Sequence, residues 1–144
     1  MAPTQLQLAA ALIESYEGLR LTAYQDTRGI WTVGFGSTSI GGKPVVKGQT
    51  ITQEQAEAAL SDYLSAALPM VGGRPLIEQA ALLDFAYNCG VGALHRVLAS
   101  EHLPPGDAMK VNLLDFDHEG GQVSEALARR RRVEWLLILA SRAV

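Results

Sequence analysis

Hydrophobic residues near the start of the chain recur at the three- and four-residue spacing of an amphipathic helix. This spacing predicts a helix from about residue 4 to Gly18, with an inward face made by Leu6, Ala9, Ala10, Ile13, Tyr16 and Glu17. Because Glu17 shares that face, we expect a carboxyl on the inward side of the last helical turn.

From Leu21 the hydrophobic period changes to two, and the same period resumes after Gly29, as is typical of two paired strands. The residues between them, Asp26-Thr27-Arg28-Gly29, begin with Asp and end with Gly, which favours a type I turn. We therefore predict a β-hairpin. Its pairing brings Thr32 back across from the segment Tyr24 to Asp26.

The rest of the chain is predicted to be mainly helical. The glycine-rich segment 36–50 indicates a loop with at most one short strand, at Val45-Val46. A capping box at Thr52 and Gln55 opens a helix over 53–67. Pro75, at the first helical position, opens a buried helix that has Leu76 and Ile77 on its apolar face and that Gly90 and Gly92 break. After the less regular stretch Ala93 to Ser100 and a loop from His102 to Gly106, a short helix covers 108–114 and a last helix, capped by Ser124, covers 124–140. The fold class is therefore α+β, with one small sheet in the N-terminal third.

The composition fits one globular domain over residues 1–144, because 48% hydrophobic residues suffice for a core at this length. A net charge of −3 gives no global positive field to attract nucleic acid. Cys89 is the single cysteine and cannot form an internal disulfide. The segment Met1 to Ile13 lacks the basic region of a signal peptide, and the longest apolar run, Trp135 to Ala140, is too short for a membrane span. We expect neither nucleic-acid binding nor membrane insertion.

One acidic cluster, formed by Asp115, Asp117, His118 and Glu119, is the only candidate for a metal site in the sequence. Its spacing matches neither an EF-hand loop nor an HExxH helix, so an ordinary acidic loop is expected. The chain also lacks a GxSxG nucleophile elbow and a phosphate-binding loop. No metal and no cofactor are therefore predicted.

Glu17 and Asp26 are the first candidates for acid–base chemistry. Lost hydration and the negative end of the helix dipole both disfavour the ionised form of Glu17, as a general acid requires, whereas Asp26 in a polar turn should stay ionised. Each residue also has a plain structural interpretation: Glu17 as a solvated neighbour of Arg20, and Asp26 as a turn-former bonded to its own backbone. Thr32 is either a β-former or a hydroxyl that helps Asp26 to hold a water.

Arg130 interrupts the apolar row of the last predicted helix, which otherwise consists of Ala126, Val133, Leu137 and Ala140. A packed arginine needs an anionic partner, because an unpaired buried charge is costly. The partner is either Glu134, four residues on, or a cleft carboxylate such as Glu17. The neighbouring Arg129, Arg131 and Arg132 are expected on a solvated face.

The segment from Glu17 to Thr38 strongly resembles the signature of phage-type lysozymes, the endolysins of glycoside hydrolase family 24. In that family a Glu, an Asp nine residues later and a Thr six residues after that form the catalytic set, and here these positions hold Glu17, Asp26 and Thr32. Further stretches resemble the second helix start, the central helix and the C-terminal arginine motif of the family: Ile51 to Ala56, Asp84 to Gly92, and Leu127 to Arg131 with Glu134-Trp135. The chain departs from the family at Ser37, where many relatives carry His, and over Ala93 to Asp107.

The resemblance implies a lysozyme-like fold, with a small sheet lobe, a larger helical lobe and a glycan cleft between them. It also implies hydrolysis of the β-1,4 bond between N-acetylmuramic acid and N-acetylglucosamine in peptidoglycan, without a cofactor. Glu17 would then protonate the leaving oxygen, Asp26 and Thr32 would position water, and Arg130 would pair with Glu17. Thr38 and Tyr87 would line the cleft, although Tyr87 also fits a core position.

The same resemblance implies a monomer that waits in the host cytoplasm until a holin pore admits it to the wall. Two other functions remain open at this stage. A lytic transglycosylase would cleave the same bond with one Glu and without need of Asp26. An inactive module on the same fold would bind the wall without turnover.

Overall fold

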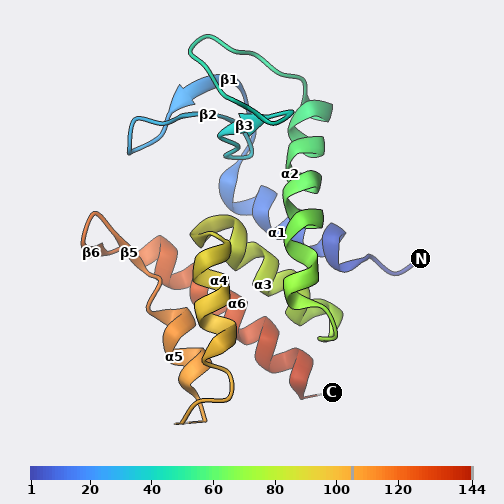
Figure 1. The fold of residues 1–144 in the computed structure, drawn as a ribbon, viewed down its shortest axis with the longest axis vertical. Coiled ribbons are helices and arrows are strands. Elements are labelled where there is room, and N and C mark those ends of the chain that lie inside the picture. The colour runs from blue at the N-terminus through green and yellow to red at the C-terminus, as the bar shows by residue number, and fades with distance from the viewer. Residues whose placement is uncertain (105, 144) are drawn as a thin grey trace.

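The computed structural model describes residues 1–104 and 106–143, and it has a small lobe of strands beside a larger body of helices. Helix α1 (Gln5–Glu17) leads directly into the hairpin of β1 (Arg20–Gln25) and β2 (Trp31–Gly34). Figure 1 shows these strands at one end of the molecule, joined to the helical body through α1 and the long helix α2 (Gln53–Ala67). The expected α+β class is confirmed.

Local signals in the sequence explain the first elements. Thr4 caps α1 in a capping box with Gln7, and the helix ends at Gly18, whose φ of 66° lies in the left-handed region that favours glycine. β1 and β2 pair antiparallel with Tyr24 opposite Thr32, as the hairpin prediction requires. The turn closes through a hydrogen bond of 2.9 Å from the Gly29 N–H to the Asp26 carbonyl.

Two short hairpins differ from the prediction. The prediction of a strand at Val45-Val46 is wrong, because the strand β4 covers Lys43–Pro44 and pairs with β3 (Ser39–Ile40). Val45 instead turns its side chain into the core, where it is 6% exposed. A further hairpin, β5 (His118–Glu119) with β6 (Gln122–Val123), was not predicted, because two-residue strands carry no hydrophobic period. Its signal was the Gly120-Gly121 pair, which supplies the positive φ angles of the turn.

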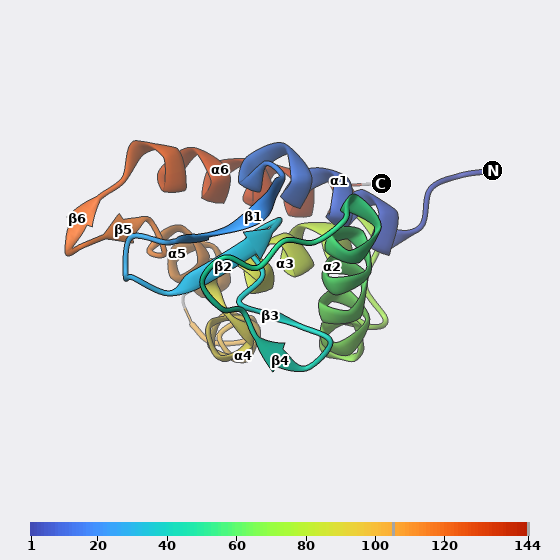
Figure 2. The ribbon, with the colours of Figure 1, turned by 90° about the horizontal axis from the view of Figure 1, so that it is seen from above.

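The helical body consists of α2, a 3-10 turn η1 (Leu68–Val71), α3 (Leu76–Cys89), α4 (Val91–Ala99), α5 (Ala108–Leu114) and α6 (Glu125–Arg142). Figure 2 shows α3 between α1, α2 and α6, and contacts with all three are recorded. Residues 78–86 of α3 are all buried, which confirms that this helix is the buried one. Leu76 and Ile77, expected on its apolar face, are half exposed at its start.

The cap predictions for the later helices mostly hold. Thr52 and Gln55 form the capping box of α2, and the Ser124 hydroxyl accepts from the Leu127 N–H at the start of α6. Pro75 precedes α3 as its N-cap rather than standing at the first helical position. Within the described residues, none of the helices has the length and apolarity that crossing a bilayer would need.

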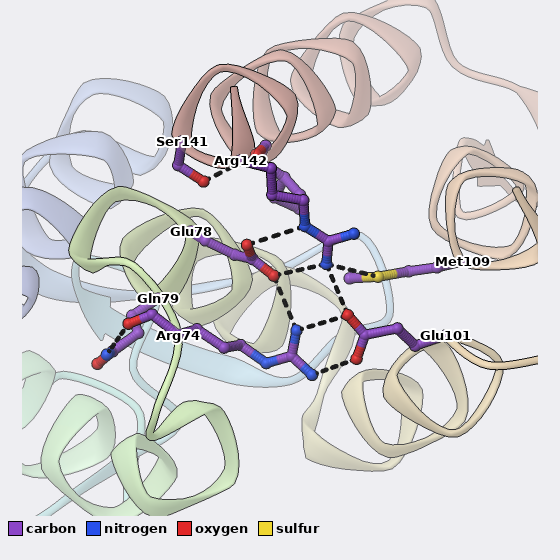
Figure 3. A network of polar contacts seen from close by, with 8 residues as sticks. Arg74, Glu78, Gln79, Glu101, Met109, Ser141 and Arg142 are labelled. Atoms are coloured by element: carbon purple, nitrogen blue, oxygen red, sulfur yellow. Dashed lines mark hydrogen bonds and ion pairs between the residues drawn. The ribbon is translucent and has the colours of Figure 1, made fainter. Parts of the chain in front are cut away.

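A cluster of four charged side chains ties the ends of the helical body together, and we call it the distal network (Figure 3). Arg74 binds Glu78 at 2.8 Å and Glu101 at 2.5 Å, while Arg142 at the end of α6 binds Glu78 and Glu101, each at 2.7 Å. Glu78 is the most buried of the four, at 1% exposed. The network thus fastens α6 to the start of α3 and to the segment after α4.

Candidate active site

A cleft of about 700 Å³ runs between the strand lobe and the helical body. Its walls come from the end of α1, the β1–β2 hairpin, the end of α3 and the β5–β6 hairpin. The lining residues are Glu17, Tyr24, Asp26, Thr27, Arg28, Thr32, Gly36, Thr38, Tyr87, Asn88, His118, Glu119, Gly120 and Leu127. The fold therefore brings Glu17, Asp26, Thr32, Thr38 and Tyr87 to one cavity, although they are spread over 71 positions of the sequence.

The two carboxylate oxygens of Glu17, the last residue of α1, lie in different environments. Oε1 accepts a hydrogen bond of 2.8 Å from Nη1 of Arg130, and the side chain is 26% exposed. A Cβ added at Gly36 would lie 3.5 Å from Oε2, so this oxygen faces the cleft wall. Arg20, the neighbour in the plain interpretation, stacks over the Tyr24 ring instead.

Arg130 lies behind Glu17 rather than in the cleft, and its guanidinium joins two helices. Nε and Nη2 donate to the two oxygens of Asp84 at 3.1 and 2.8 Å, while Nη1 donates to Glu17. The alternative partner Glu134 is farther away, at 4.0 Å from Nε. Burial would lower the pKa of Arg130, but its hydrogen bonds to Asp84 and Glu17 raise it overall. Arg130 is therefore a permanent cation, and of the two partners expected from the sequence Glu17 is the one to which it donates.

Asp26 is both a turn-former and a cleft residue. Its Oδ1 accepts from the backbone N–H groups of Arg28 and Ile30 at 2.8 and 2.9 Å, and its Oδ2 accepts from the Arg28 guanidinium at 3.2 Å. The Ile30 N–H first, followed by the contacts from Arg28, holds the pKa of Asp26 below its usual value. The carboxylate is thus ionised at neutral pH.

The remaining cleft residues differ in how their hydroxyls are used. Thr32 is 4% exposed and donates to the Ile30 carbonyl at 2.9 Å, so its oxygen can still accept one hydrogen bond. Tyr87 donates to the Phe35 carbonyl at 2.6 Å, and its ring packs edge-on against Tyr63. Burial is the main cause that raises the pKa of Tyr87 to about 12. Thr38 is exposed at the cleft edge.

The prediction that Arg131 lies on a solvated face is wrong. Its side chain is fully buried, donating to Glu134 Oε1 at 2.5 Å and to the Cys89 sulfur at 2.6 Å. The reason is that α6 packs against both α3 and α5, so its buried arc is wider than one helical row. Arg132 is exposed and pairs with Glu125, and Arg129 is exposed, as expected.

Asp84 is the site residue that sequence reasoning missed. A charged residue inside a helix predicted to be buried was the available signal, since such a charge requires a partner. Glu17, Asp84, Arg130, Arg131 and Glu134 form a continuous group of ionisable side chains behind the cleft, and we call it the inner network.

Comparison with known proteins agrees with this geometry. The model of the Phage lysozyme family matches residues 14–134. The chain is 33% identical over 142 residues to the endolysin of Bacillus phage B103, a match that covers 92% of this chain and 53% of that protein. The chain thus spans about half the length of the curated relatives it matches first.

Solved structures show the same fold. The endolysin from Escherichia coli O157:H7 phage FAHEc1 superposes with a TM-score of 0.79 at 29% identity, covering 94% of this chain and 92% of that chain. The muramidase domain of SpmX from Asticaccaulis excentricus superposes with a TM-score of 0.71 at 28% identity, covering 91% and 94%. From its sequence match and its fold, the chain belongs to the phage lysozyme family.

Proposed function

We propose that the chain is a muramidase that hydrolyses the β-1,4 bond between N-acetylmuramic acid and N-acetylglucosamine in peptidoglycan. The observation that carries this proposal is the pair of carboxyl groups in one cleft, each with a different environment. Asp26 is stabilised as an anion by backbone N–H groups, while Glu17 has one oxygen bound by Arg130 and the other beside Gly36 of the cleft wall. Two carboxyls in unlike environments suit glycoside hydrolysis by acid and base.

Glu17 acts as the general acid in this proposal. A proton on Oε2 is transferred to the oxygen of the leaving sugar as the glycosidic bond breaks. The carboxylate that this transfer produces already has a hydrogen bond from Arg130 at Oε1. The ion pair therefore becomes stronger as the reaction proceeds, which is how a fixed charge lowers a barrier.

Asp26 and Thr32 position the attacking water. The Thr32 hydroxyl donates to the Ile30 carbonyl, so its oxygen accepts one hydrogen of the water. Asp26 accepts the other hydrogen at Oδ2, because Oδ1 is already occupied by two backbone N–H groups. The water oxygen then bonds to the anomeric carbon while its proton passes to Asp26, and the leaving oxygen takes the proton of Glu17.

Thr38 and Tyr87 are proposed to bind the glycan. Thr38 offers an exposed hydroxyl at the cleft edge. The Tyr87 hydroxyl is occupied by the Phe35 carbonyl, so this residue contributes a ring surface rather than a hydrogen bond to the sugar. The β5–β6 hairpin supplies the opposite wall through His118, Glu119 and Gly120.

The test is mass spectrometry of the soluble products after purified sacculi are incubated with the wild-type protein, Glu17→Gln or Asp26→Asn. Asn at 26 is the matched change, because its amide oxygen can still accept the two backbone N–H groups of the turn. We expect reducing-end muropeptides from the wild type and almost none from either variant. Anhydro-ended products from both wild type and Asp26→Asn would assign the protein to the transglycosylases. Binding to sacculi without products would make it an inactive module.

We further propose that the protein acts as a monomer, waits in the host cytoplasm and reaches the wall through a holin pore. This route rests on the family resemblance. Expression in a bacterial host with and without a co-expressed holin tests it, with lysis expected only when the holin is present. Lysis at the same time in both cultures would contradict the route, and sedimentation analysis tests the monomer.

A further inference from the structure

Asp84 accepts hydrogen bonds from the Arg130 guanidinium, the same group that contacts Glu17. Its carboxylate is fully buried in α3 and accepts from Nε and Nη2 of Arg130, while Nη1 of that group points to Glu17. The guanidinium is planar, so fixing two of its nitrogens fixes the third. The Tyr16 ring, 4.5 Å from the guanidinium carbon, adds a second restraint.

The inner network has more acids than bases. Its carboxyl groups belong to Glu17, Asp84 and Glu134, and its cations are Arg130 and Arg131. Glu134 is 1% exposed, and its Oε1 accepts from Arg131. Its Oε2 is buried without a hydrogen-bond partner in the part of the chain that the structure describes. A buried carboxylate oxygen left unpaired is costly.

A proton on Glu134 removes that cost. The protonated Oε2 becomes a donor, and the neighbouring carboxylate of Asp84 is an acceptor for it. Burial first, and then this contact with Asp84, raises the pKa of Glu134 well above its usual value. Glu134 therefore holds its proton to a higher pH than an exposed glutamate does, and Arg131 remains as the cation beside it.

We propose that Asp84 is a positioning residue for Glu17, acting through Arg130, and that neutral Glu134 supports Asp84 by donating a hydrogen bond to it. Asp84 takes up part of the Arg130 charge, so that less of this charge acts on Glu17 than an unshared guanidinium would exert. The inference rests on the proposed role of Glu17 as the general acid. It extends the acid–base machinery from the cleft to two side chains that do not touch the substrate.

Other titratable groups face this network from the elements packed around it. Burial raises the pKa values of Tyr16 and Tyr87, and it raises that of the Cys89 thiol behind Arg131, so these groups stay neutral from pH 4 to 8. Across the cleft lie the charged groups Asp26, Arg28, His118 and Glu119. Every variant below therefore carries His118→Gln, which removes the imidazole among the cleft-lining residues.

The central comparison is Asp84→Asn against Glu134→Gln, two substitutions that replace a buried carboxyl by an amide of the same shape. Asp84→Asn removes a charge, so the full charge of Arg130 acts on Glu17. The alkaline limb of the kcat/KM profile on sacculi should then move to lower pH by about one unit. Glu134→Gln replaces a neutral acid by a neutral amide that still accepts from Arg131 and donates to Asp84. Its profile should match that of the parent.

A second readout does not depend on catalysis. The ¹³C resonance of the Glu17 side-chain carboxyl, assigned by its absence in Glu17→Gln, reports the pH at which that group loses its proton. We expect this midpoint to fall by about one pH unit in Asp84→Asn and to stay unchanged in Glu134→Gln. An unchanged midpoint in Asp84→Asn, or equal shifts in both variants, would overturn the inference. If the wild type releases no products, the proposed function fails while the resonance still decides the inference.

Arg130→Lys keeps the inference testable if Asp84→Asn does not fold. A lysine has the positive charge of arginine but lacks the planar guanidinium that binds two carboxyls at once. Asp84 is fully buried, so leaving it without a cation costs more than leaving Glu17 without one. We expect the ammonium to remain with Asp84 and the Glu17 midpoint to move to higher pH. A midpoint that stays at the parent value would show that Asp84 does not hold the cation, and would overturn the inference.

Discussion

The distal network and the inner network are both built from arginines and carboxyl groups, yet they shift the pKa values of their buried glutamates in opposite directions. Glu78 and Glu134 are each 1% exposed. Burial alone would raise the pKa of Glu78, but hydrogen bonds from Arg142 and Arg74 together bring it below its usual value. Burial is the main cause that raises the pKa of Glu134, the neighbouring Asp84 raises it further, and its one direct arginine contact does not reverse the shift. Burial raises the pKa of both carboxyls, and the number of guanidinium groups that bind each one decides whether that rise is reversed.

The two networks also differ in what they can do. In the distal network two carboxylates face two arginines, and every charge is matched within the cluster. It fastens helices and has no contact with the cleft. The inner network has an excess carboxyl and ends on Glu17, which lines the cleft. A network with matched charges serves stability, whereas an unmatched one adjusts where a proton resides.

The largest expected difference between the networks comes from removing one arginine from each. Arg130→Met leaves the fully buried Asp84 without its bidentate partner, and we expect a loss of about 4 kcal/mol in the free energy of unfolding. Arg142→Met should cost about 1 kcal/mol, because its side chain is 37% exposed and Arg74 still binds both glutamates. Urea unfolding at pH 7 measures both. Equal losses would remove the distinction.

The same amide substitution at the two buried glutamates gives the next largest contrast. Glu78→Gln breaks matched ion pairs and should destabilise the protein by about 2 kcal/mol. Glu134→Gln resembles the protonated form, which burial of Glu134 favours, and should cost under about 1 kcal/mol. Urea midpoints at pH 7 check the pair of values. A greater loss in Glu134→Gln than in Glu78→Gln would mean that Glu134 is ionised.

The pH dependence of stability should separate the networks by sign. The lowered pKa values of Glu78 and Glu101 give stability that is present above their unfolded value of about 4.3 and is lost as pH falls through the lower folded values. The raised pKa of Glu134 acts in the other direction, because the folded state keeps a proton that the unfolded chain releases above about pH 4.3. Stability from Glu134 therefore declines as pH rises toward its folded value.

Melting temperatures between pH 3 and pH 9 test these signs. Glu78→Gln should flatten the acid side of the curve, and Glu134→Gln should flatten the decline toward alkaline pH. A curve in Glu134→Gln that declines toward alkaline pH as steeply as in the wild type would contradict a neutral Glu134.

The smallest expected effect is a control within the arginine run. Arg132 is exposed and pairs with Glu125 at 3.0 Å, so Arg132→Ala should change the free energy of unfolding by less than about 0.5 kcal/mol. The same urea titration applies. A loss comparable to that of Arg130→Met would show that position in the run, rather than burial, determines the effect.

Elements with local signals were predictable from the sequence. The Asp26-to-Gly29 turn, the Thr52 capping box and the helix 108–114 all depend on neighbours within a few residues, and the structure has each of them. The cleft could be anticipated because the resemblance spans both lobes. It assembles Glu17, Asp26 and Thr32 in one cavity, although their catalytic roles stay predictions.

The buried polar contacts could not be predicted in the same way. The helical row predicted that Arg130 faces inward but did not predict the burial of Arg131. The burial of Arg131 depends on α3 and α5 both packing on α6. The ion pair between Asp84 and Arg130 joins residues that lie 46 positions apart in the sequence. No local rule gives the register between two helices, so the partner of a buried charge is known only after they pack.

Cys89, which accepts a hydrogen bond from Arg131, offers a natural chemical probe of this part of the protein. The thiol is the single one in the sequence, and its sulfur accepts from Arg131 at 2.6 Å. A disulfide reagent that releases a coloured thiolate therefore reads one position without any engineered label. Cys89 is only partly buried and lines a small pocket with Asn88 and His118, so the rate reports access to that pocket. Because Asn88, His118 and Leu127 also line the cleft, reaction in the presence and absence of glycan would report binding in the cleft as a change in the rate of colour formation at Cys89.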